Sequence, residues 1–185
     1  MEFITNLDFK ILLFLQKLHN PLLNYLMIFF STLNNYGFIC FLSGILLMFK
    51  KKYRVYGIMI IIATLTTAFV GNIILKNVFE RPRPFHSYDI NLIIEEPSGF
   101  SFPSGHTSSA FVCAGMLSVI NKKLCIISYT VASLIAISRA YLFVHFPSDI
   151  IAGALLGITM SWIFIYLYNT MFPKKAFNLK YKSHQ

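Results

Sequence analysis

The feature that most restricts the fold of this chain is a set of long apolar runs that contain no charged residue. Residues 55–75 carry no charged side chain, and neither do residues 150–173. Each run is as long as the roughly 20 apolar residues that a helix needs to cross the hydrocarbon core of a bilayer. The chain is also 56% hydrophobic and only 12% charged, which is too apolar for a soluble domain of 185 residues. We therefore predict an all-α, polytopic membrane helix bundle, with residues 1–185 forming a single domain.

Charged and polar residues divide the chain into about five predicted spans. Residues 79–103 are polar and hold four prolines, so we expect a loop there. The predicted spans lie before and after this loop and cover residues 36–49, 55–78, 105–120, 124–143 and 147–171.

The N-terminal region is harder to assign because charged and helix-breaking residues interrupt its apolar pattern. Within residues 8–33, no uncharged stretch reaches the length of a span. We expect two short helices that lie in the membrane interface, with a break at Asn20-Pro21. A complete first span through this region is the competing interpretation, and the sequence leaves it open.

The basic residues indicate how the chain is oriented in its membrane. They occur in short clusters between apolar runs, so the positive-inside rule explains the net charge of +9 better than a nucleic-acid partner does. If the tail of residues 174–185 is cytoplasmic, five spans leave ten basic residues inside and six outside. The inner set is Lys50, Lys51, Lys52, Arg54, Lys122, Lys123, Lys174, Lys175, Lys180 and Lys182, and the outer set is Lys10, Lys17, Lys76, Arg81, Arg83 and Arg139. We therefore predict a multi-pass protein of a bacterial plasma membrane.

An arginine, a histidine and an aspartate follow one another at the junction of the last two predicted spans. An ionisable residue at membrane depth is costly unless it is paired or faces water, so Arg139, His145 and Asp149 are candidate functional residues. Pro147 suits the first turn of a helix, which places His145 just ahead of a helix start where an anion can bind. Asp149, four residues on, can orient the imidazole and leave its other nitrogen free to attack.

Two further cations fall at the same predicted membrane face. Lys76 ends the second span and Arg83 follows it in the loop. Together with Arg139 they supply positive charge, and the two arginines present a fork of donors that matches phosphate oxygens. The sequence therefore predicts an oxyanion site at this face.

A second histidine belongs to the same predicted site. Ser104 is a predicted helix N-cap, and Gly105 allows the backbone to approach an anion closely. His106 is suited to donate a proton to a leaving oxygen while His145 attacks. Carboxylates are too few for a magnesium site and the arginines would repel a cation, so we expect no metal and no cofactor.

These segments together resemble the type 2 phosphatidic acid phosphatase superfamily, which also includes bacterial acid phosphatases and vanadium haloperoxidases. The family pattern reads K-x6-R-P, then P-S-G-H, then S-R-x5-H-x3-D. It matches from Lys76 to Arg83-Pro84, from Pro103 to His106 and from Ser138 to Asp149, without a departure. The motifs cover residues 76–149, and the helical setting extends the likeness over most of the chain.

The resemblance implies a membrane-embedded lipid phosphatase that needs no metal. In this scheme His145 would carry a phosphohistidine intermediate, Asp149 would orient it, and His106 would be the general acid. The phosphoryl group would be held by Lys76, Arg83, Ser104, Gly105 and Arg139.

For a membrane-embedded member, the resemblance leaves several lipid substrates open. Compact bacterial members look similar to undecaprenyl-diphosphate phosphatases, so we expect hydrolysis of undecaprenyl diphosphate to undecaprenyl phosphate at the outer membrane face. Phosphatidylglycerophosphate or phosphatidate phosphatase activity is the alternative within the family. A lipid-phosphate binder or translocator without catalysis is the alternative from another class, but it would not need both His106 and His145. The lipid and the oligomeric state stay open.

Several residues outside the motifs receive plainer interpretations. We expect Glu80 and Arg81 to be surface residues of the loop, and we assign no role to His19 or His184. His86 follows the motif closely enough to line the site entrance, although the sequence favours an ordinary loop residue.

Small residues in the apolar runs are expected to serve packing. Gly153 and Gly157 form a small-xxx-small pattern that suits close contact between helices of one bundle. The cysteines lack the spacing of a metal or redox motif, so we interpret all three as small core residues: Cys40, Cys113 and Cys125.

Overall fold

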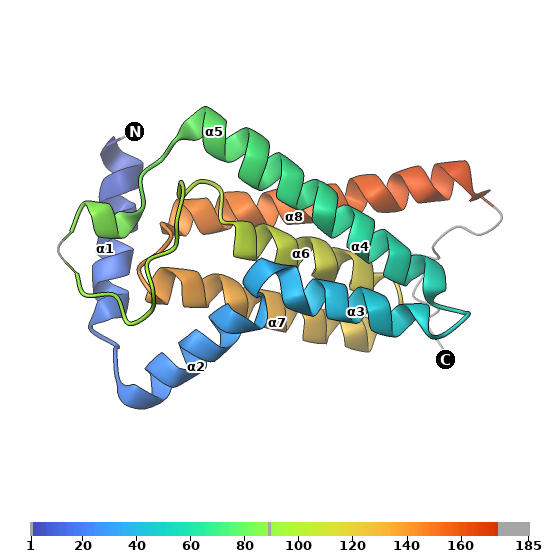
Figure 1. The fold of residues 1–185 in the computed structure, drawn as a ribbon, viewed down its shortest axis with the longest axis horizontal. Coiled ribbons are helices and arrows are strands. Elements are labelled where there is room, and N and C mark those ends of the chain that lie inside the picture. The colour runs from blue at the N-terminus through green and yellow to red at the C-terminus, as the bar shows by residue number, and fades with distance from the viewer. Residues whose placement is uncertain (1, 89, 174–185) are drawn as a thin grey trace.

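The computed structural model describes residues 2–88 and 90–173, and within them the secondary structure is helical, with no β-strand. The predicted all-α membrane helix bundle is thus confirmed. Figure 1 shows α3, α4, α6, α7 and α8 running along the long axis of the molecule, while α1 crosses one end of the bundle. The predicted tail of residues 174–185 lies outside the described residues. The helices are α1 (Glu2–Gln16), α2 (Pro21–Leu33), α3 (Phe38–Met48), α4 (Arg54–Ala68), α5 (Lys76–Phe79), α6 (Gly105–Ser118), α7 (Lys122–Tyr141) and α8 (Pro147–Met171).

The first long uncharged run forms one continuous helical segment. A π-helical stretch, Phe69–Leu75, joins α4 to α5, so the chain is helical from Arg54 to Phe79. This agrees with the predicted span of residues 55–78. Glu80 has a φ of 43°, and this left-handed conformation ends α5 and starts the loop.

Fewer helices reach the length of a membrane span than the sequence predicted. Of the described residues, three segments are long and apolar enough: Arg54–His86, α7 and α8. A fourth exists if α2 and α3, which are bent by 45° at a short break, form one broken span. The predicted span of residues 105–120 is helical as α6, but α6 has only 14 residues. Because α6 packs against α4, α7 and α8, protein and not lipid surrounds much of it. The count of five spans is therefore not confirmed.

The N-terminal region forms two separate helices, as expected from the break at Asn20-Pro21. The Oδ1 of Asn20 accepts a hydrogen bond from the Leu23 N–H at 3.0 Å, and Pro21 is the first residue of α2. No single helix continues through residues 8–33, but α2 can form one broken span together with α3, so the choice between interfacial helices and a first span stays open.

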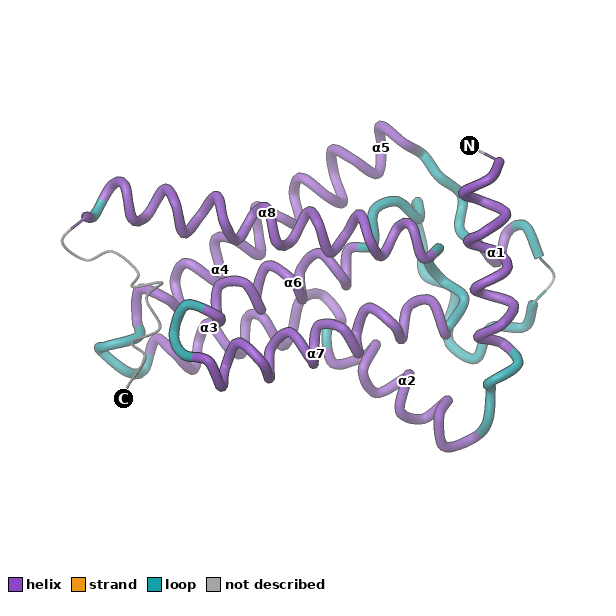
Figure 2. Tube along the Cα trace, turned by 180° about the vertical axis from the view of Figure 1, so that it is seen from behind, coloured by secondary structure: helices purple, strands orange, loops and turns teal. Residues whose placement is uncertain are grey.

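The core of the bundle is built around α6. Figure 2 shows α8, α6 and α7 side by side, and α6 contacts both of its neighbours. A Cβ atom on Gly153 would lie 2.7 Å from the carbonyl oxygen of Ser104, and one on Gly157 would lie 2.8 Å from the nitrogen of Val112. Only glycine allows α8 to approach α6 this closely. The predicted packing role of both glycines within the bundle is confirmed.

The cysteines and the outer surface follow the pattern of a membrane bundle. Cys40 and Cys113 are buried among apolar core residues, as predicted, whereas Cys125 is half-buried. On the outer face of α8, Trp162 and Tyr166 are each 69% exposed. Large exposed apolar side chains of this kind suit contact with lipid.

Candidate active site

The residues singled out by the sequence gather at the end of the bundle that α1 crosses. At this end α6 and α8 begin and α7 ends (Figure 1). Electrostatic interactions link His106 with four other members of the predicted set, so the fold brings together residues that are far apart in the sequence: Arg139, His145, Lys76 and Arg83.

His145 lies directly before α8, as the sequence predicted from Pro147. Its Nδ1 is 3.6 Å from the Oδ2 of Asp149, a distance slightly longer than a hydrogen bond. The same carboxylate oxygen accepts a hydrogen bond from the Phe146 N–H at 2.9 Å and another from the Ser101 hydroxyl. The carboxylate therefore caps the start of α8 and faces the imidazole at the same time.

Arg83 reaches the other side of the imidazole. Its guanidinium donates to the carbonyl oxygens of Gly99, Ser98 and Val144 at 2.8, 3.0 and 3.0 Å. Its Nη1 lies 3.4 Å from the Nε2 of His145. The loop and the α7–α8 connection thus hold a buried cation against the ring nitrogen that does not face Asp149.

The surroundings of His145 keep its imidazole neutral. The side chain is 2% exposed. Burial, together with the charges of Arg83 and Arg139, lowers the pKa of His145 to about 3, although the contact with Asp149 acts in the opposite direction. A neutral imidazole with one nitrogen facing a carboxylate is the form that can act as a nucleophile.

Two more cations complete the positive side of the site. Arg139 is 3% exposed and donates a hydrogen bond to the Ser31 hydroxyl of α2, while its buried Nε makes no hydrogen bond within the described residues. Lys76 is half-buried and interacts electrostatically with Arg83, Arg139 and Asp149, yet its ammonium group makes neither a hydrogen bond nor an ion pair in the described part of the chain. Buried donors without a partner suit an anion.

Ser104 and Gly105 occupy the predicted helix start, but not with the predicted contacts. Ser104 is the N-cap residue of α6, yet its side chain does not cap the helix. Its Oγ instead accepts a hydrogen bond from the Thr107 hydroxyl at 3.0 Å, and its N–H donates to the Asp149 carbonyl at 3.1 Å. A Cβ on Gly105 would lie 2.7 Å from the Oδ1 of Asn72, so glycine also makes room for the π-helical stretch.

His106 lies at the start of α6 in a different environment from His145. Its Nε2 is 3.0 Å from the Oδ1 of Asn35, in the break between α2 and α3. The neighbouring Asn34 donates to the His106 carbonyl at 2.9 Å and to the Ser109 hydroxyl at 2.8 Å. Two asparagines that the sequence reasoning did not single out therefore hold this histidine.

Arg81 was predicted to be a surface residue of the loop, and this prediction is wrong. Its guanidinium forms ion pairs with Asp149 at 2.6 Å and with Asp8 at 2.9 Å. The pattern of residues 76–149 cannot reveal this because Asp8 lies far upstream. Asp149 was singled out because a charged side chain in an apolar helix is costly unless it is paired. The same argument applies to Asp8.

The other charged or histidine residues considered in the sequence analysis are exposed or make contacts away from the candidate site. Glu80 and His86 are exposed, as expected of loop residues. His19, which received no role, stacks on Tyr141 at a ring distance of 4.3 Å and lies 3.1 Å from its carbonyl oxygen. His184 lies outside the described residues.

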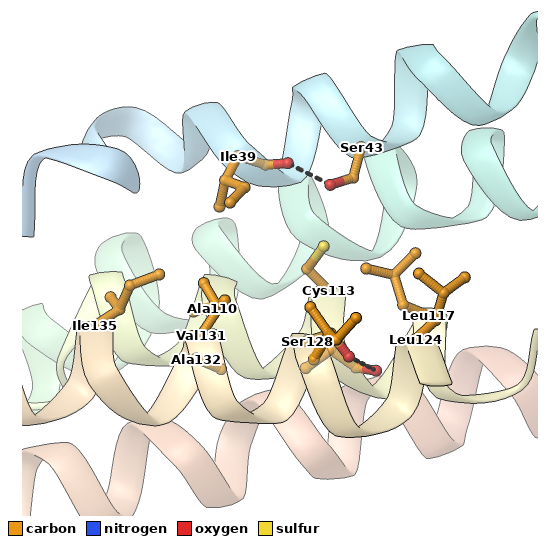
Figure 3. A pocket seen from close by; sticks show the side chains of 12 residues that line it. Ile39, Ser43, Ala110, Cys113, Leu117, Leu124, Ser128, Val131, Ala132 and Ile135 are labelled. Atoms are coloured by element: carbon orange, nitrogen blue, oxygen red, sulfur yellow. Dashed lines mark hydrogen bonds between the residues drawn. The ribbon is translucent and has the colours of Figure 1, made fainter. Parts of the chain in front are cut away.

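A cavity of about 200 Å³ lies between α3, α6 and α7, as Figure 3 shows. Its walls are apolar, and on α6 it extends from Ala110, about one turn after His106, to Leu117. The Ser43 hydroxyl in its wall bonds to the Ile39 carbonyl at 2.7 Å and so satisfies its donor within the helix. Ile127 on the rim is 48% exposed, which places the rim at the outer surface of the bundle.

The described residues contain no group of three or more histidine, cysteine, aspartate or glutamate side chains that could hold a metal ion. Among residues 2–88 and 90–173, the acidic groups at the candidate site are Asp8 and Asp149, and both are paired with Arg81. The metal-free chemistry expected from the sequence stays a prediction.

Comparison with known proteins supplies the family. An undecaprenyl-diphosphatase from Sulfolobus acidocaldarius is 31% identical over 169 residues, which cover 89% of this chain and 81% of that protein. The crystal structure of a transmembrane PAP2-type phosphatidylglycerolphosphate phosphatase from Bacillus subtilis matches 97% of this chain and 90% of its own, with a TM-score of 0.76 and 27% identity. LpxE from Aquifex aeolicus matches with a TM-score of 0.77 and 32% identity, over 86% of this chain and 95% of its own. The family model of the PAP2 superfamily covers residues 53–173, more than half of the chain. This protein belongs to the PAP2 superfamily.

Proposed function

We propose that the protein hydrolyses a lipid-linked phosphate through a phosphohistidine at His145, without a metal ion, and that its substrate is undecaprenyl diphosphate. The observation that carries the proposal is the pairing of His145 with Asp149 on one side and with a cluster of incompletely paired cations on the other. Such a cluster is complementary to a phosphoryl transition state.

In the proposed first step, the Nε2 of His145 attacks phosphorus. Its Nδ1 faces the Asp149 carboxylate, which stabilises the positive charge that develops on the ring. Arg83, Arg139 and Lys76 hold the phosphoryl oxygens, assisted by Ser104 and Gly105 at the start of α6. The N–P bond forms as the P–O bond to the leaving group breaks.

His106 handles the protons of both steps. It protonates the leaving oxygen in the first step and accepts a proton from the attacking water in the second, when a new P–O bond replaces the N–P bond. The neighbouring Arg139, Lys76 and Arg83 support a position beside the phosphoryl group, but burial and these cations lower the pKa of His106 in the free site, so the negative charge of the bound phosphate must offset them before His106 can be protonated. Orthophosphate and the dephosphorylated lipid product then leave.

The apolar cavity supports a substrate with a long hydrocarbon chain. It starts about one turn from His106 and its rim is at the bundle surface, so a chain can extend from the site toward lipid. The Sulfolobus relative is named an undecaprenyl-diphosphatase, which favours a polyprenyl diphosphate. The Bacillus structure supports phosphatidylglycerophosphate as the alternative substrate.

We further propose that residues 1–185 work as one lipid phosphatase domain in a bacterial plasma membrane. The ten-to-six distribution of basic residues supports a cytoplasmic tail of residues 174–185 and a site that faces outward. A site at a membrane surface suits a substrate whose chain lies in lipid and whose phosphate lies among the headgroups.

The test is an assay of the purified full chain in detergent against undecaprenyl diphosphate, phosphatidylglycerophosphate and phosphatidate. We expect the highest kcat/KM with undecaprenyl diphosphate, full activity in excess chelator, and a base-stable, acid-labile phosphoprotein. His145→Ala should abolish both turnover and label, while His86→Ala, which changes an exposed histidine, should keep both. Loss of activity on chelation with recovery on adding magnesium would contradict the mechanism. Binding of the lipids without turnover would favour the non-catalytic alternative.

A further inference from the structure

Two buried carboxylates beside the candidate active site share one cation. Asp8 of α1 is 3% exposed and Asp149 of α8 is fully buried. Arg81 lies between them and uses Nη2 for Asp8 at 2.9 Å and Nη1 for Asp149 at 2.6 Å. Because a buried carboxylate without a partner is strongly destabilising, Arg81 is required wherever both acids are ionised.

The two oxygens of Asp149 have separate partners. Oδ2 faces His145 and accepts from Phe146 and Ser101. Oδ1 accepts only from Arg81 among the contacts of the described residues. A carboxylate held at both oxygens cannot rotate about its Cβ–Cγ bond, so Arg81 fixes the plane that Asp149 presents to the imidazole.

Arg81 is itself held firmly in place. Its guanidinium carbon lies 3.9 Å from the centroid of the Phe146 ring, and Nη1 also donates to the Ser148 hydroxyl at 2.7 Å. Its backbone carbonyl accepts from the Ser101 N–H at 2.8 Å, which ties it to the residue whose hydroxyl bonds to Asp149. Asp8, which pairs with Arg81, also accepts a hydrogen bond from the Ser148 N–H at 2.9 Å and so connects α1 to the first turn of α8.

We propose that Arg81 is a positioning residue for the reaction at His145, and that Asp8 makes α1 part of the machinery that orients the imidazole. The inference rests on the proposed function. Arg81 acts through Asp149 and not on the phosphoryl group, because both of its Nη atoms already donate to Asp8, Ser148 and Asp149. The cations for the substrate are instead Lys76, Arg83 and Arg139.

A purely structural role makes a different prediction. If Arg81 only neutralises buried acids, its loss lowers stability but leaves the folded fraction with normal turnover. If it positions Asp149, kcat falls even well below the unfolding temperature, while KM changes little because substrate contacts are intact. A displaced imidazole slows single-turnover formation of the phosphohistidine in the same proportion as kcat.

Three variants of the full-length protein separate these roles. Arg81→Lys keeps the charge but cannot bridge both carboxylates, and we expect kcat to fall about 10-fold. Arg81→Gln removes the charge, and we expect a loss on the order of 100-fold. Asp8→Asn keeps the Arg81–Asp149 pair but loosens it, with an expected loss of about threefold and no further effect when added to Arg81→Gln. Lys10→Gln, at an exposed position of α1, is the control and should change kcat by less than about twofold.

The experiment distinguishes a failure of the positioning role of Arg81 from a failure of the proposed function. A wild-type protein that hydrolyses no lipid phosphate overturns the proposed function and this inference with it. An active wild type whose kcat and single-turnover rate are unchanged in Arg81→Lys and Asp8→Asn overturns only the positioning role. If Arg81→Gln does not fold, those two variants still decide, because each retains a partner for at least one buried charge.

Discussion

The two histidines of the site are chemically identical residues in unlike environments. His145 is almost fully buried between a carboxylate and a guanidinium, whereas His106 is half-buried against the neutral side-chain amide of Asn35. Burial and the nearby cations lower the pKa of both imidazoles and keep them neutral in the free site, but only His145 faces a carboxylate that can orient it as a nucleophile. Their roles should therefore be separable by substrate chemistry.

His106→Ala should harm monophosphate substrates more than diphosphate substrates. An alkoxide that leaves from a lipid monophosphate needs a proton, whereas a phosphate that leaves from a diphosphate needs it much less. The difference between the two losses should approach the roughly 100-fold or more that general acids supply. Parallel kcat measurements on phosphatidate and undecaprenyl diphosphate provide the check, with Asp149→Asn as a variant that should slow both alike. Equal losses in His106→Ala would mean that this residue is not the acid.

The neutral state of His145 should make stability depend on pH. In the unfolded chain a histidine has a pKa near about 6.5, whereas burial lowers the pKa of folded His145 to about 3. Between these values the unfolded state binds the extra proton, so stability falls as pH falls, by up to about 1.4 kcal/mol per pH unit. Thermal unfolding in detergent from pH 7 to 4.5 should show this slope. His145→Asn should reduce the slope, leaving the part that comes from His106, whose pKa burial and nearby cations also lower, and His86→Asn should not change it; an equal slope in all three proteins would contradict the argument.

The motif residues could be predicted from the sequence because their spacing is local, but their partners could not. Lys76, Arg83, Arg139, His145 and Asp149 lie within two short segments, and the fold gathers them at one end. Asp8 and Asn35 reach the site through tertiary packing, and their separation from the motifs hides them. Ser101 lies two residues before the motif of Pro103 to His106, but the pattern does not include it.

At the scale of elements, the apolar runs predict which segments are helical but not how long each helix is. α7 and α8 match their predicted ranges closely, because charge and proline mark both ends. The break between α2 and α3 falls where the predicted region 8–33 ends and the predicted span 36–49 begins, and Tyr36 and Gly37 there have φ values of 54° and 74°. Its two asparagines bind α6, and such a contact is invisible in a hydrophobicity pattern.

Gly157→Val should loosen the contact between α6 and α8. Its side chain would meet the α6 backbone near Val112, and overpacking of this kind costs about 1 to 3 kcal/mol. Because α6 carries His106 and α8 carries Asp149, activity should fall together with the unfolding temperature. Thr159→Val on the exposed face of α8 is the matched control. A Gly157→Val protein with unchanged unfolding would show that the two helices adjust at little cost.

At the scale of the whole molecule, the charges define an orientation that can be tested. A protease applied from outside intact cells should leave the chain beyond Pro173 uncut, because the basic clusters favour a cytoplasmic tail. Immunoblotting with a tag after Gln185 provides the measurement, and cells opened before digestion are the control. Loss of the tag in intact cells would reverse the topology and place the site in the cytoplasm.

The hydrogen bonds of Arg83 to three backbone carbonyls bear on how a catalytic cycle ends. Carbonyl oxygens hold the guanidinium in place but leave its positive charge, whereas a carboxylate would neutralise that charge. The positive charge that attracts a lipid phosphate is therefore undiminished once orthophosphate has formed beside it. The inorganic product should compete with the lipid for the site, and its departure, more than bond cleavage, should limit the rate when substrate is abundant.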